Sequence, residues 1–283
     1  MANTIVYGEE WSTKLQERLS EPVKWKDICR VEYTNSRVLH NPYLTVPTVQ
    51  TGERGTAYTM QAITETNSYV TIDTFKILPQ FIDRADLAQS TFMRQMELAD
   101  LQGILLNEAI ETALYADWSN LTSFGNDQIG GSAGTITVSA TNIDDIIRAM
   151  KREIRKASGE GLMNRNGAFI VWYPTHFEIL ESYMQANGFV TADTALKGGT
   201  KQGIEYMGVT HYSSNLLATG HVVGGVKKVY HLGILKDTYG QVMVNEKDPL
   251  NISGISVVSR VDFKGKVWEN VLPVLFNIHV EAW

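Results

Sequence analysis

The stretch that decides the fold is residues 100–118, which read DLQGILLNEAIETALYADW. Apolar side chains recur there at helical spacing, in two adjacent rows. The first row holds Leu101, Leu105, Ala109 and Ala113, and the second begins with a polar residue, Gln102, and continues with Leu106, Ile110 and Leu114. No proline interrupts residues 83–118, and Asp86 with Gln89 resembles a capping box. The sequence therefore predicts one long helix of about 45–50 Å.

The segment before this helix has a different composition. Nine of residues 45–77 are threonine, and valines and isoleucines add to the β-branched content, which favours extended strands. Turn signals stand at 52–55 and 66–68. This predicts one or two hairpins with little apolar material for a core of their own. Because an isolated two-stranded hairpin is marginal in water, we expect the segment to pack on its own body or on a neighbouring subunit.

Residues 1–45 do not have the pattern of an independent domain. A short amphipathic turn begins at Trp11 and includes Leu15 and Leu19, and Pro22 ends it. The arm is too short to bury itself, so it must lie on another surface or stay mobile.

The segment after the long helix begins with residues 119–140, rich in Gly, Ser, Thr and Asn, and this predicts a joint between two lobes. An α/β series follows. Ile143, Ile147, Met150 and Ile154 form the apolar stripe of a helix capped at Thr141 and ended by Gly159, and the continuous apolar run 168–173 predicts a buried strand. Pro174 begins another helix, which we expect to end near Gly188. Further strands are expected at 204–210, 222–235, 241–245 and 255–263, and in an extended tail at 271–280 that could return to the first lobe.

Composition narrows the class of protein. A chain of 283 residues can bury a large core without disulfides or metals, and its single cysteine, Cys29, excludes a disulfide framework. The net charge of -6 argues against a protein that grips nucleic acid by its phosphates. Neither an apolar signal segment nor an uninterrupted membrane span is visible, so the class is a soluble intracellular protein of one or two domains.

No catalytic or cofactor-binding constellation stands out, so no catalytic residue, cofactor or metal is expected. The six histidines lack ligand spacing and are best interpreted as structural or surface residues. Cys29 is best interpreted as a small buried residue, and Asp144 with Asp145 as partners of a helix dipole. The basic residues of 148–156 are interpreted as a solvated helix face, with contact to nucleic acid or an acidic partner as the alternative.

The order of these parts resembles the major capsid proteins of tailed phages, which have the HK97-like fold. Four stretches carry the resemblance. They are YVTIDTFK at 69–76 leading into FIDRADLAQS at 81–90, EAIETAL at 108–114, NGAFIVWYP at 166–174, and GIEYMGVTHYSSNL at 203–216. His211 departs from the family pattern, in which an apolar residue is usual at that position.

The resemblance implies an α+β fold of defined parts. These are an N-terminal arm at 1–45, an extended β-hairpin loop at 46–77 that lies over the adjacent subunit, a peripheral lobe with a spine helix at 78–140, completed by 266–283, and an α/β axial lobe at 141–265. Some relatives join subunits through an isopeptide bond from a lysine in the extended loop. Here Lys76 stands only at the base of that loop, so such a bond is not expected.

The function that the resemblance implies is structural, without catalysis. The chain would self-assemble through hexamers and pentamers into an icosahedral shell around double-stranded phage DNA, touched by weak non-specific contacts. Assembly would take place in the bacterial host cytoplasm, without a membrane, and the virion capsid would be the final location. Because 1–45 is too short for a scaffolding segment, the expected partners are a separate scaffolding protein, a portal and a decoration protein.

Candidate inter-subunit residues are few. Glu53 and Arg54 carry opposite charges at a hairpin turn, and a solvated tip is the alternative interpretation. The other candidates are Tyr58 and Met60 in the loop and Trp11 and Trp25 in the arm. An encapsulin-like compartment, an enzyme with an unrecognised site and a phage tail or connector protein remain as alternative functions.

Overall fold

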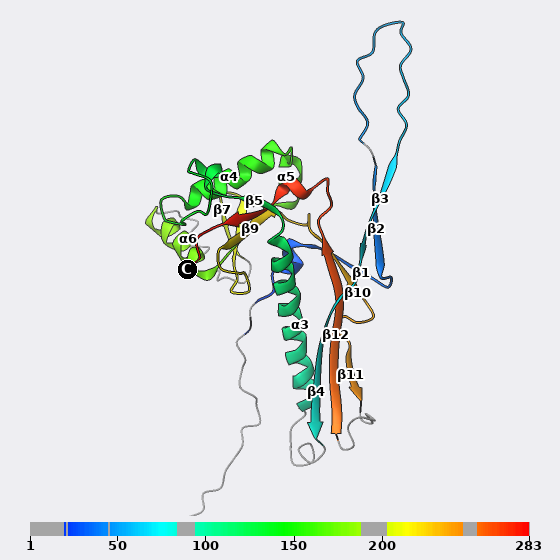
Figure 1. Cartoon of the computed structure of the whole chain (residues 1–283), viewed down its shortest axis with the longest axis vertical. Coiled ribbons are helices and arrows are strands. Elements are labelled where there is room, and N and C mark those ends of the chain that lie inside the picture. Colours follow the sequence, from blue (N-terminus) through cyan, green and yellow to red (C-terminus); the bar gives the residue numbers. More distant parts are fainter. Residues whose placement is uncertain are drawn as a thin grey trace, which may run out of the picture.

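The computed structural model describes residues 20, 22–44, 46–83, 94–187, 203–245 and 254–282. These residues form a globular lobe, an elongated lobe beside it and a hairpin that projects beyond both along the long axis of the molecule (Figure 1). The expected capping box at 86–89, Trp11 and the expected helix end at Gly188 lie outside the described residues.

The elongated lobe consists of a long helix packed on one face of a twisted sheet (Figure 1). The sheet runs in the order β1-β10-β12-β11, with β4 pairing β12 as well. Its elements are α3 (Arg94–Trp118), β1 (Arg30–Thr34), β4 (Thr74–Asp83), β10 (His231–Leu235), β11 (Val242–Asn245) and β12 (Gly254–Lys266). The β4 and β12 strands are antiparallel over their whole shared length, from Thr74 opposite Phe263 to Asp83 opposite Gly254.

Helix α3 buries the second of its two predicted rows. Leu106, Ile110, Leu114 and Trp118 are buried, whereas the row through Leu101, Leu105, Ala109 and Ala113 is half-buried. The polar start of the buried row has a physical reason. The Gln102 amide donates from Nε2 to Gln80 Oε1 at 3.0 Å and to the Val257 carbonyl at 3.3 Å, and Ser259 Oγ donates to its Oε1. A fully buried amide is thereby satisfied by the strands beneath the helix.

The globular lobe is an α/β layer around a second sheet, ordered β5-β13-β9-β6-β8-β7. Its strands are β5 (Thr122–Phe124), β6 (Ala168–Trp172), β7 (Ile204–Tyr206), β8 (Val209–Ser213), β9 (His221–Val226) and β13 (Leu275–His279). Its helices are α4 (Ile143–Lys156), α5 (Glu160–Asn166) and α6 (Pro174–Ala186), with short 3-10 turns η1 (Asn126–Ile129) and η3 (Leu272–Val274). The predicted strand at 168–173 is confirmed, and every residue of β6 is buried.

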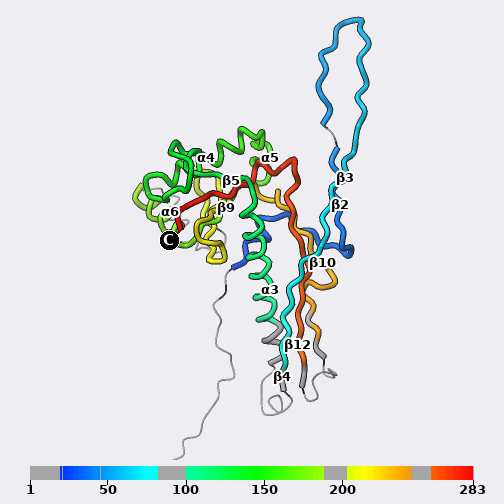
Figure 2. Tube along the Cα trace, viewed as in Figure 1, coloured from blue at the N-terminus to red at the C-terminus, as the bar shows by residue number. Residues whose placement is uncertain are grey.

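The expected division of the chain between lobes is wrong in its second half. Strands β10, β11 and β12, assigned to the axial lobe, belong to the sheet of the elongated lobe, and β13, assigned to the peripheral lobe, lies between β5 and β9 in the globular sheet. The apolar run 222–235 is therefore two strands of different sheets, separated by a turn in which Lys228 has φ 60°. Figure 2 shows the chain crossing back to the globular lobe near its C-terminal end.

A local error of the same kind concerns residues 204–210, which were expected to form one strand. They form the hairpin β7–β8 instead, and Met207 and Gly208 have φ of 52° and 68°. Two consecutive positive φ values are typical of the tight type I′ turn, whose twist matches that of paired strands.

The boundary between the arm and the hairpin, and the end of the hairpin, also differ from the expected ones. The hairpin strands are β2 (Val38–Leu44) and β3 (Glu65–Thr71), in register from Val38 opposite Thr71 to Leu44 opposite Glu65, so the hairpin starts within the predicted arm. Residues 74–77 already belong to β4. Ahead of β1, helix α1 (Trp25–Ile28) lies in the main core.

A buried carboxylate fixes that arm to the long helix. Glu111 is fully buried on α3, and its Oε2 accepts from the Lys24 backbone N–H at 2.7 Å while its Oε1 accepts from Tyr115 Oη at 2.7 Å. Burial raises the pKa of Glu111, and these hydrogen bonds partly oppose the shift. The arm from Lys24 onward is therefore part of the folded body and not a free segment.

Candidate inter-subunit surface

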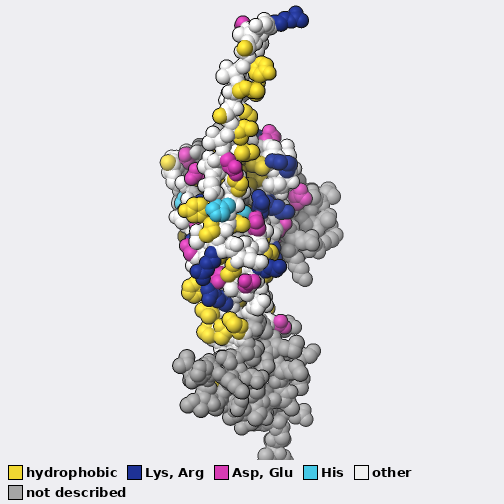
Figure 3. All heavy atoms as spheres, turned by 90° about the vertical axis from the view of Figure 1, so that its right-hand side faces the viewer, with side chains coloured by type: hydrophobic (Ala, Val, Ile, Leu, Met, Phe, Trp, Pro, Cys, Tyr) yellow, Lys and Arg dark blue, Asp and Glu magenta, His cyan; other side chains and the backbone are white. Residues whose placement is uncertain are grey.

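The loop at the end of the hairpin, residues 46–64, is exposed throughout. It extends away from the body of the molecule (Figure 1) and carries large apolar side chains with almost no contact to their own chain. Val49 is 96% exposed, Met60 83% and Tyr58 79%, and Val46 and Ile63 are similarly exposed. Figure 3 shows hydrophobic side chains following the projecting loop down towards the body. So many large apolar side chains exposed on one loop indicate a surface that a partner covers.

Few internal bonds shape the loop. The Gln61 side chain crosses it, accepting from the Thr48 backbone N–H at 2.9 Å and donating to the Thr48 carbonyl at 2.8 Å. At the tip the Thr56 N–H donates to the Glu53 carbonyl, and Gly55 has φ 91°, which suits the third position of a type II turn. The turn places Arg54 at its centre. The loop therefore has a defined tip, and the Gln61 side chain joins its two sides.

The root of the hairpin is firmly attached to the body. Leu39 and Val70, one from each strand, form a small buried cluster with Trp268, which follows β12. Lys266 Nζ donates to the Tyr69 carbonyl at 3.0 Å and stands over the Trp268 ring at 5.1 Å. These contacts fix the direction in which the hairpin leaves the body, so the exposed loop is presented on a supported stem.

A second apolar surface covers the face of the long sheet opposite α3. Phe75, Ile77, Pro79 and Phe81 alternate along β4 and are exposed, and Met243 of β11 is 62% exposed. Gln80, between them, faces α3 and reaches Gln102. In Figure 3 hydrophobic side chains gather again at the lower end of the described sheet. We call this set, Phe75, Ile77, Pro79, Phe81 and Met243, the outer sheet face.

Part of the outer sheet face is ordered by charge. The Arg260 guanidinium lies 4.9 Å from the centre of the Phe75 ring and donates from Nε to Asp262 Oδ1 at 2.8 Å. The carboxylate orients the guanidinium against the ring, an arrangement in which a cation is attracted by the face of the π-system. Charged side chains thus border the outer sheet face at Phe75, whereas the part around Ile77 and Phe81 is apolar.

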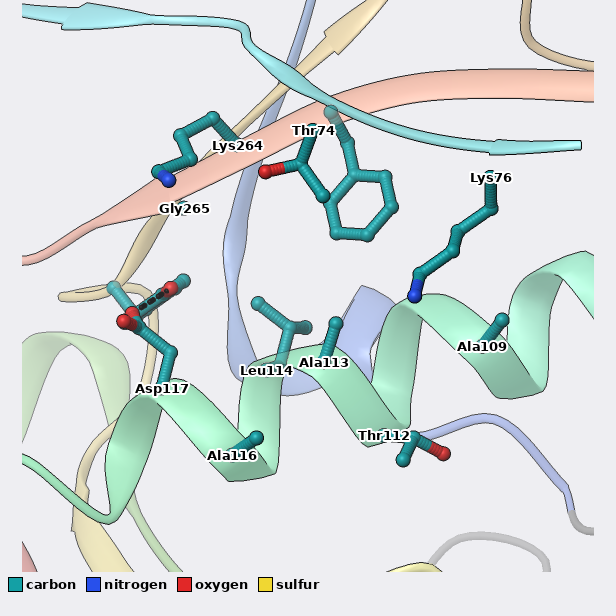
Figure 4. A pocket seen from close by; sticks show the side chains of 12 residues that line it. Thr74, Lys76, Ala109, Thr112, Ala113, Leu114, Ala116, Asp117, Lys264 and Gly265 are labelled. Carbon is teal, nitrogen blue, oxygen red and sulfur yellow. Dashed lines mark hydrogen bonds between the residues drawn. The ribbon is translucent and has the colours of Figure 1, made fainter.

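On its other side the sheet and α3 enclose a hollow of about 670 Å³ (Figure 4). Lys76 of β4 points across it towards the helix, and Lys264 of the neighbouring strand β12 lies at the other end of the hollow, on the same side as Lys76. At its end Tyr230 Oη donates to Asp117 Oδ2 at 2.6 Å, and burial beside that carboxylate raises the pKa of Tyr230. Lys76 is exposed, and its amine is directed towards α3 and not towards the loop tip.

The charged and thiol groups singled out in the sequence have structural surroundings. Cys29 is buried, and burial raises the pKa of its thiol, which disfavours the nucleophilic thiolate. On α4, Arg148 pairs with Asp144 at 2.7 Å, and Lys156 pairs with Glu153 at 2.8 Å, so this basic face is partly neutralised by its own helix. Within the part of the chain that the structure describes, no group of three or more His, Cys, Asp or Glu is placed to hold a metal ion.

His211, the departure from the family pattern, is a core residue. Its ring is fully buried on β8, where its Nδ1 accepts from Trp172 Nε1 at 3.0 Å and its Nε2 lies 3.3 Å from the Tyr206 carbonyl. Because Trp172 can only donate, the proton of the neutral imidazole is on Nε2. Burial lowers the pKa of His211 to about 4.

The predicted interface residues divide between two environments. Glu53, Arg54, Tyr58 and Met60 all lie in the exposed loop. Trp25 is 1% exposed inside the main core, so its expectation as an interface residue is wrong. Its neighbours Ile28 and Cys29 are buried with it, because the arm enters the core through the contact with Glu111. The outer sheet face was missed, although the alternation in FKILPQF at 75–81 is its sequence signal.

The comparisons with known proteins identify the fold. No family model matches the sequence, and no curated protein does. A solved structure of Mycobacterium phage Che8 matches with a TM-score of 0.70 at 17% identity, covering 98% of each chain. The capsid of Ralstonia phage GP4 matches with a TM-score of 0.69 at 10% identity, covering 100% of this chain and 99% of that one. A virus-like particle from Pyrococcus furiosus matches less well, with a TM-score of 0.53 at 10% identity and 90% coverage of both.

These matches run over nearly the whole chain, so the fold is that of the HK97-like capsid proteins of tailed phages. The α+β class expected from the sequence is confirmed. Among the helices of the described residues, none is long and apolar enough to cross a bilayer.

Proposed function

We propose that this chain is a major capsid protein that self-assembles into an icosahedral shell around the double-stranded DNA of a tailed phage. The observation that carries the proposal is the loop at 46–64, whose apolar side chains find no cover in their own chain. The fold, which is shared with phage capsid proteins over nearly the full length, supports a role for this loop in contacts between subunits.

The energetic argument starts from the loop itself. Burying one large apolar side chain stabilises a contact by about 1.5–3 kcal/mol. Val46, Val49, Tyr58, Met60 and Ile63 together therefore offer several kcal/mol per subunit if a neighbour covers them. Association costs on the order of 4–15 kcal/mol, so one such contact is weak alone. In a closed shell every subunit covers a neighbour with its own loop and is covered by the loop of another, so the free energies of many such contacts add up.

In this proposal the loop of one subunit lies over the outer sheet face of the next. Both surfaces are apolar and exposed, and the supported stem directs the loop beyond the edge of its own body (Figure 1). The opposite charges of Glu53 and Arg54 at the tip then pair with charges of the neighbour. Exposed pairs contribute only ~0.2–1 kcal/mol, so they set register more than strength.

The further partners follow from the same role. The subunits would form hexamers and pentamers, with a separate scaffolding protein, a portal and a decoration protein, and would touch the packaged DNA only weakly. The virion capsid is the proposed location, and no catalysis is involved. The net charge of -6 suits a wall that does not adhere to DNA along its inner face.

The test uses matched charge insertions. Purified wild-type chain, with scaffolding protein present if needed, should form closed particles in negative-stain electron microscopy. Met60→Asp in the loop and Phe81→Asp on the outer sheet face should each abolish particles without lowering the melting temperature of the free chain. Leu272→Asp, at an exposed apolar position outside both surfaces, is the control and should still assemble. Compact monomers only, from wild type with scaffold, would contradict the proposal.

A protein compartment of the same fold, loaded with enzyme, is the second candidate. The match to a virus-like particle from Pyrococcus furiosus keeps a particle other than a phage capsid in view, although that similarity is lower than for the phage structures. The content of purified particles separates the two. Packaged DNA supports the phage capsid, and a co-purifying cargo protein supports the compartment.

A further inference from the structure

Two histidines that are 58 positions apart in the sequence meet at the edge of the globular lobe. His221 begins β9, His279 ends β13, and they are direct partners across the antiparallel pair. Their ring centres are 5.5 Å apart and the ring planes are inclined by 58°. Both residues are half-exposed, so solvent and dissolved ions reach them.

The backbone brings these side chains as close as a sheet allows. The Val280 N–H donates to the Gly220 carbonyl at 3.0 Å, which makes the flanking pair the hydrogen-bonded one. The His279 carbonyl accepts instead from the Ile136 N–H on the other side. His221 and His279 are therefore a non-hydrogen-bonded pair, in which opposite side chains are nearest.

A neighbouring amide fixes which nitrogen of His221 is available. The Asn277 side chain is fully buried, and its Nδ2 donates to the Ser119 carbonyl at 3.0 Å, so its Oδ1 must be the acceptor. His221 Nδ1 lies 3.0 Å from that Oδ1 and therefore carries the proton. In the neutral ring the lone pair is then on Nε2. An oriented imidazole whose second nitrogen donates to a fixed oxygen is the usual arrangement of a metal-ligating histidine.

The separation of the rings also fits a shared metal ion. With metal–nitrogen distances of about 2.0–2.1 Å, the ion lies about 3.2 Å from each ring centre, so a tetrahedral ion holds the centres about 5 Å apart. The observed 5.5 Å is close to this value. Neutral imidazole nitrogens prefer zinc, copper and nickel over calcium or magnesium.

We propose that His221 and His279 form a binding site for a divalent transition-metal ion that joins β9 to β13. The chain supplies two nitrogen ligands, and water or another molecule supplies the remaining positions. The ion would tie the C-terminal strand, which returns from the elongated lobe, to the sheet of the globular lobe. The site shares no residue with the loop or the outer sheet face, so metal binding can be tested separately from the proposed shell function.

The experiment is a titration of the full chain, produced without a polyhistidine tag, with ZnCl2 at neutral pH in a calorimeter. Wild type should bind about one ion per chain in a saturable isotherm. His221→Asn and His279→Asn should each weaken binding at least tenfold, since each removes one of two ligands. His40→Asn is the matched control, because His40 is also exposed and its Nδ1 also lies 2.9 Å from an asparagine Oδ1, that of Asn67. That variant should bind as wild type does.

A second readout does not depend on the variants folding. Cu²⁺ added to wild type should give an electron paramagnetic resonance spectrum with two coordinated imidazole nitrogens. A spectrum without nitrogen ligands, no saturable zinc binding by wild type, or unchanged binding in both histidine variants would overturn the proposal.

Discussion

The junction between the lobes and the loop at 46–64 are both rich in large apolar side chains, but they differ in what covers them. At the junction Trp118 is 1% exposed, and its ring lies 5.3–5.8 Å from the rings of Tyr230, Phe169 and Tyr115. In the loop Tyr58 and Met60 are about as exposed as in an unfolded chain. The same residue types therefore stabilise the monomer in one place and remain available for association in the other.

The strongest test of this comparison is Trp118→Ala. Removing a buried tryptophan loses its burial and leaves a cavity among three rings, which costs about 3–5 kcal/mol of the free energy of unfolding. Denaturant unfolding monitored by circular dichroism measures it. Tyr58→Ala is the paired control and should change the free energy of unfolding of the monomer by less than about 0.5 kcal/mol. Equal losses of stability in the two variants would mean that Tyr58 is as well packed in the monomer as Trp118.

The buried ring of His211 makes the stability of the core depend on pH, unlike that of the exposed loop. Burial lowers its pKa from 6.5 to about 4, so the folded state disfavours the proton that the unfolded state accepts. Its contribution to the free energy of unfolding is fully present above pH 6.5. It is lost progressively as the pH falls from 6.5 through about 4, and the total loss is roughly 3 kcal/mol. His211→Leu should remove this acid-dependent part while leaving the Trp172 N–H unpaired, at a cost of about 1–3 kcal/mol at neutral pH.

Unfolding of wild type and His211→Leu, measured between pH 7 and pH 4, checks the sign. The advantage of wild type over the variant should shrink as the pH falls. A constant difference across this range would mean that the ring is not held neutral in the core.

The smallest expected change in stability is that of Arg54→Glu. The side chain lies at an exposed turn, so the melting temperature of the monomer should not change. Two adjacent acids at the tip should impair assembly, and particle yield by electron microscopy measures this. Equal yield from variant and wild type would leave Arg54 as a solvated tip residue and remove it from the interface.

Elements with a strong local pattern were predictable from sequence. The run AFIVWY predicted β6, and the stripe from Ile143 to Ile154 predicted α4, because a period in apolar residues reports the buried face directly. The Thr-rich composition of 45–77 predicted a hairpin without its own core, although its strands begin at Val38 and end at Thr71. Local pattern did not show which lobe the later strands join, since any apolar strand satisfies either sheet.

Contacts between residues far apart in the sequence could not be predicted for the same reason. The burial of Trp25 depends on Glu111, 86 residues further on, and the pairing of His221 with His279 depends on the register of β9 and β13. The sequence alone determined the periods, the turns and the excess of apolar side chains that the hairpin cannot bury. Only the tertiary structure decided which strands share a sheet, which tryptophan is core and which histidines meet. Those outcomes depend on contacts between distant segments, whose free energy is not encoded in any local window of residues.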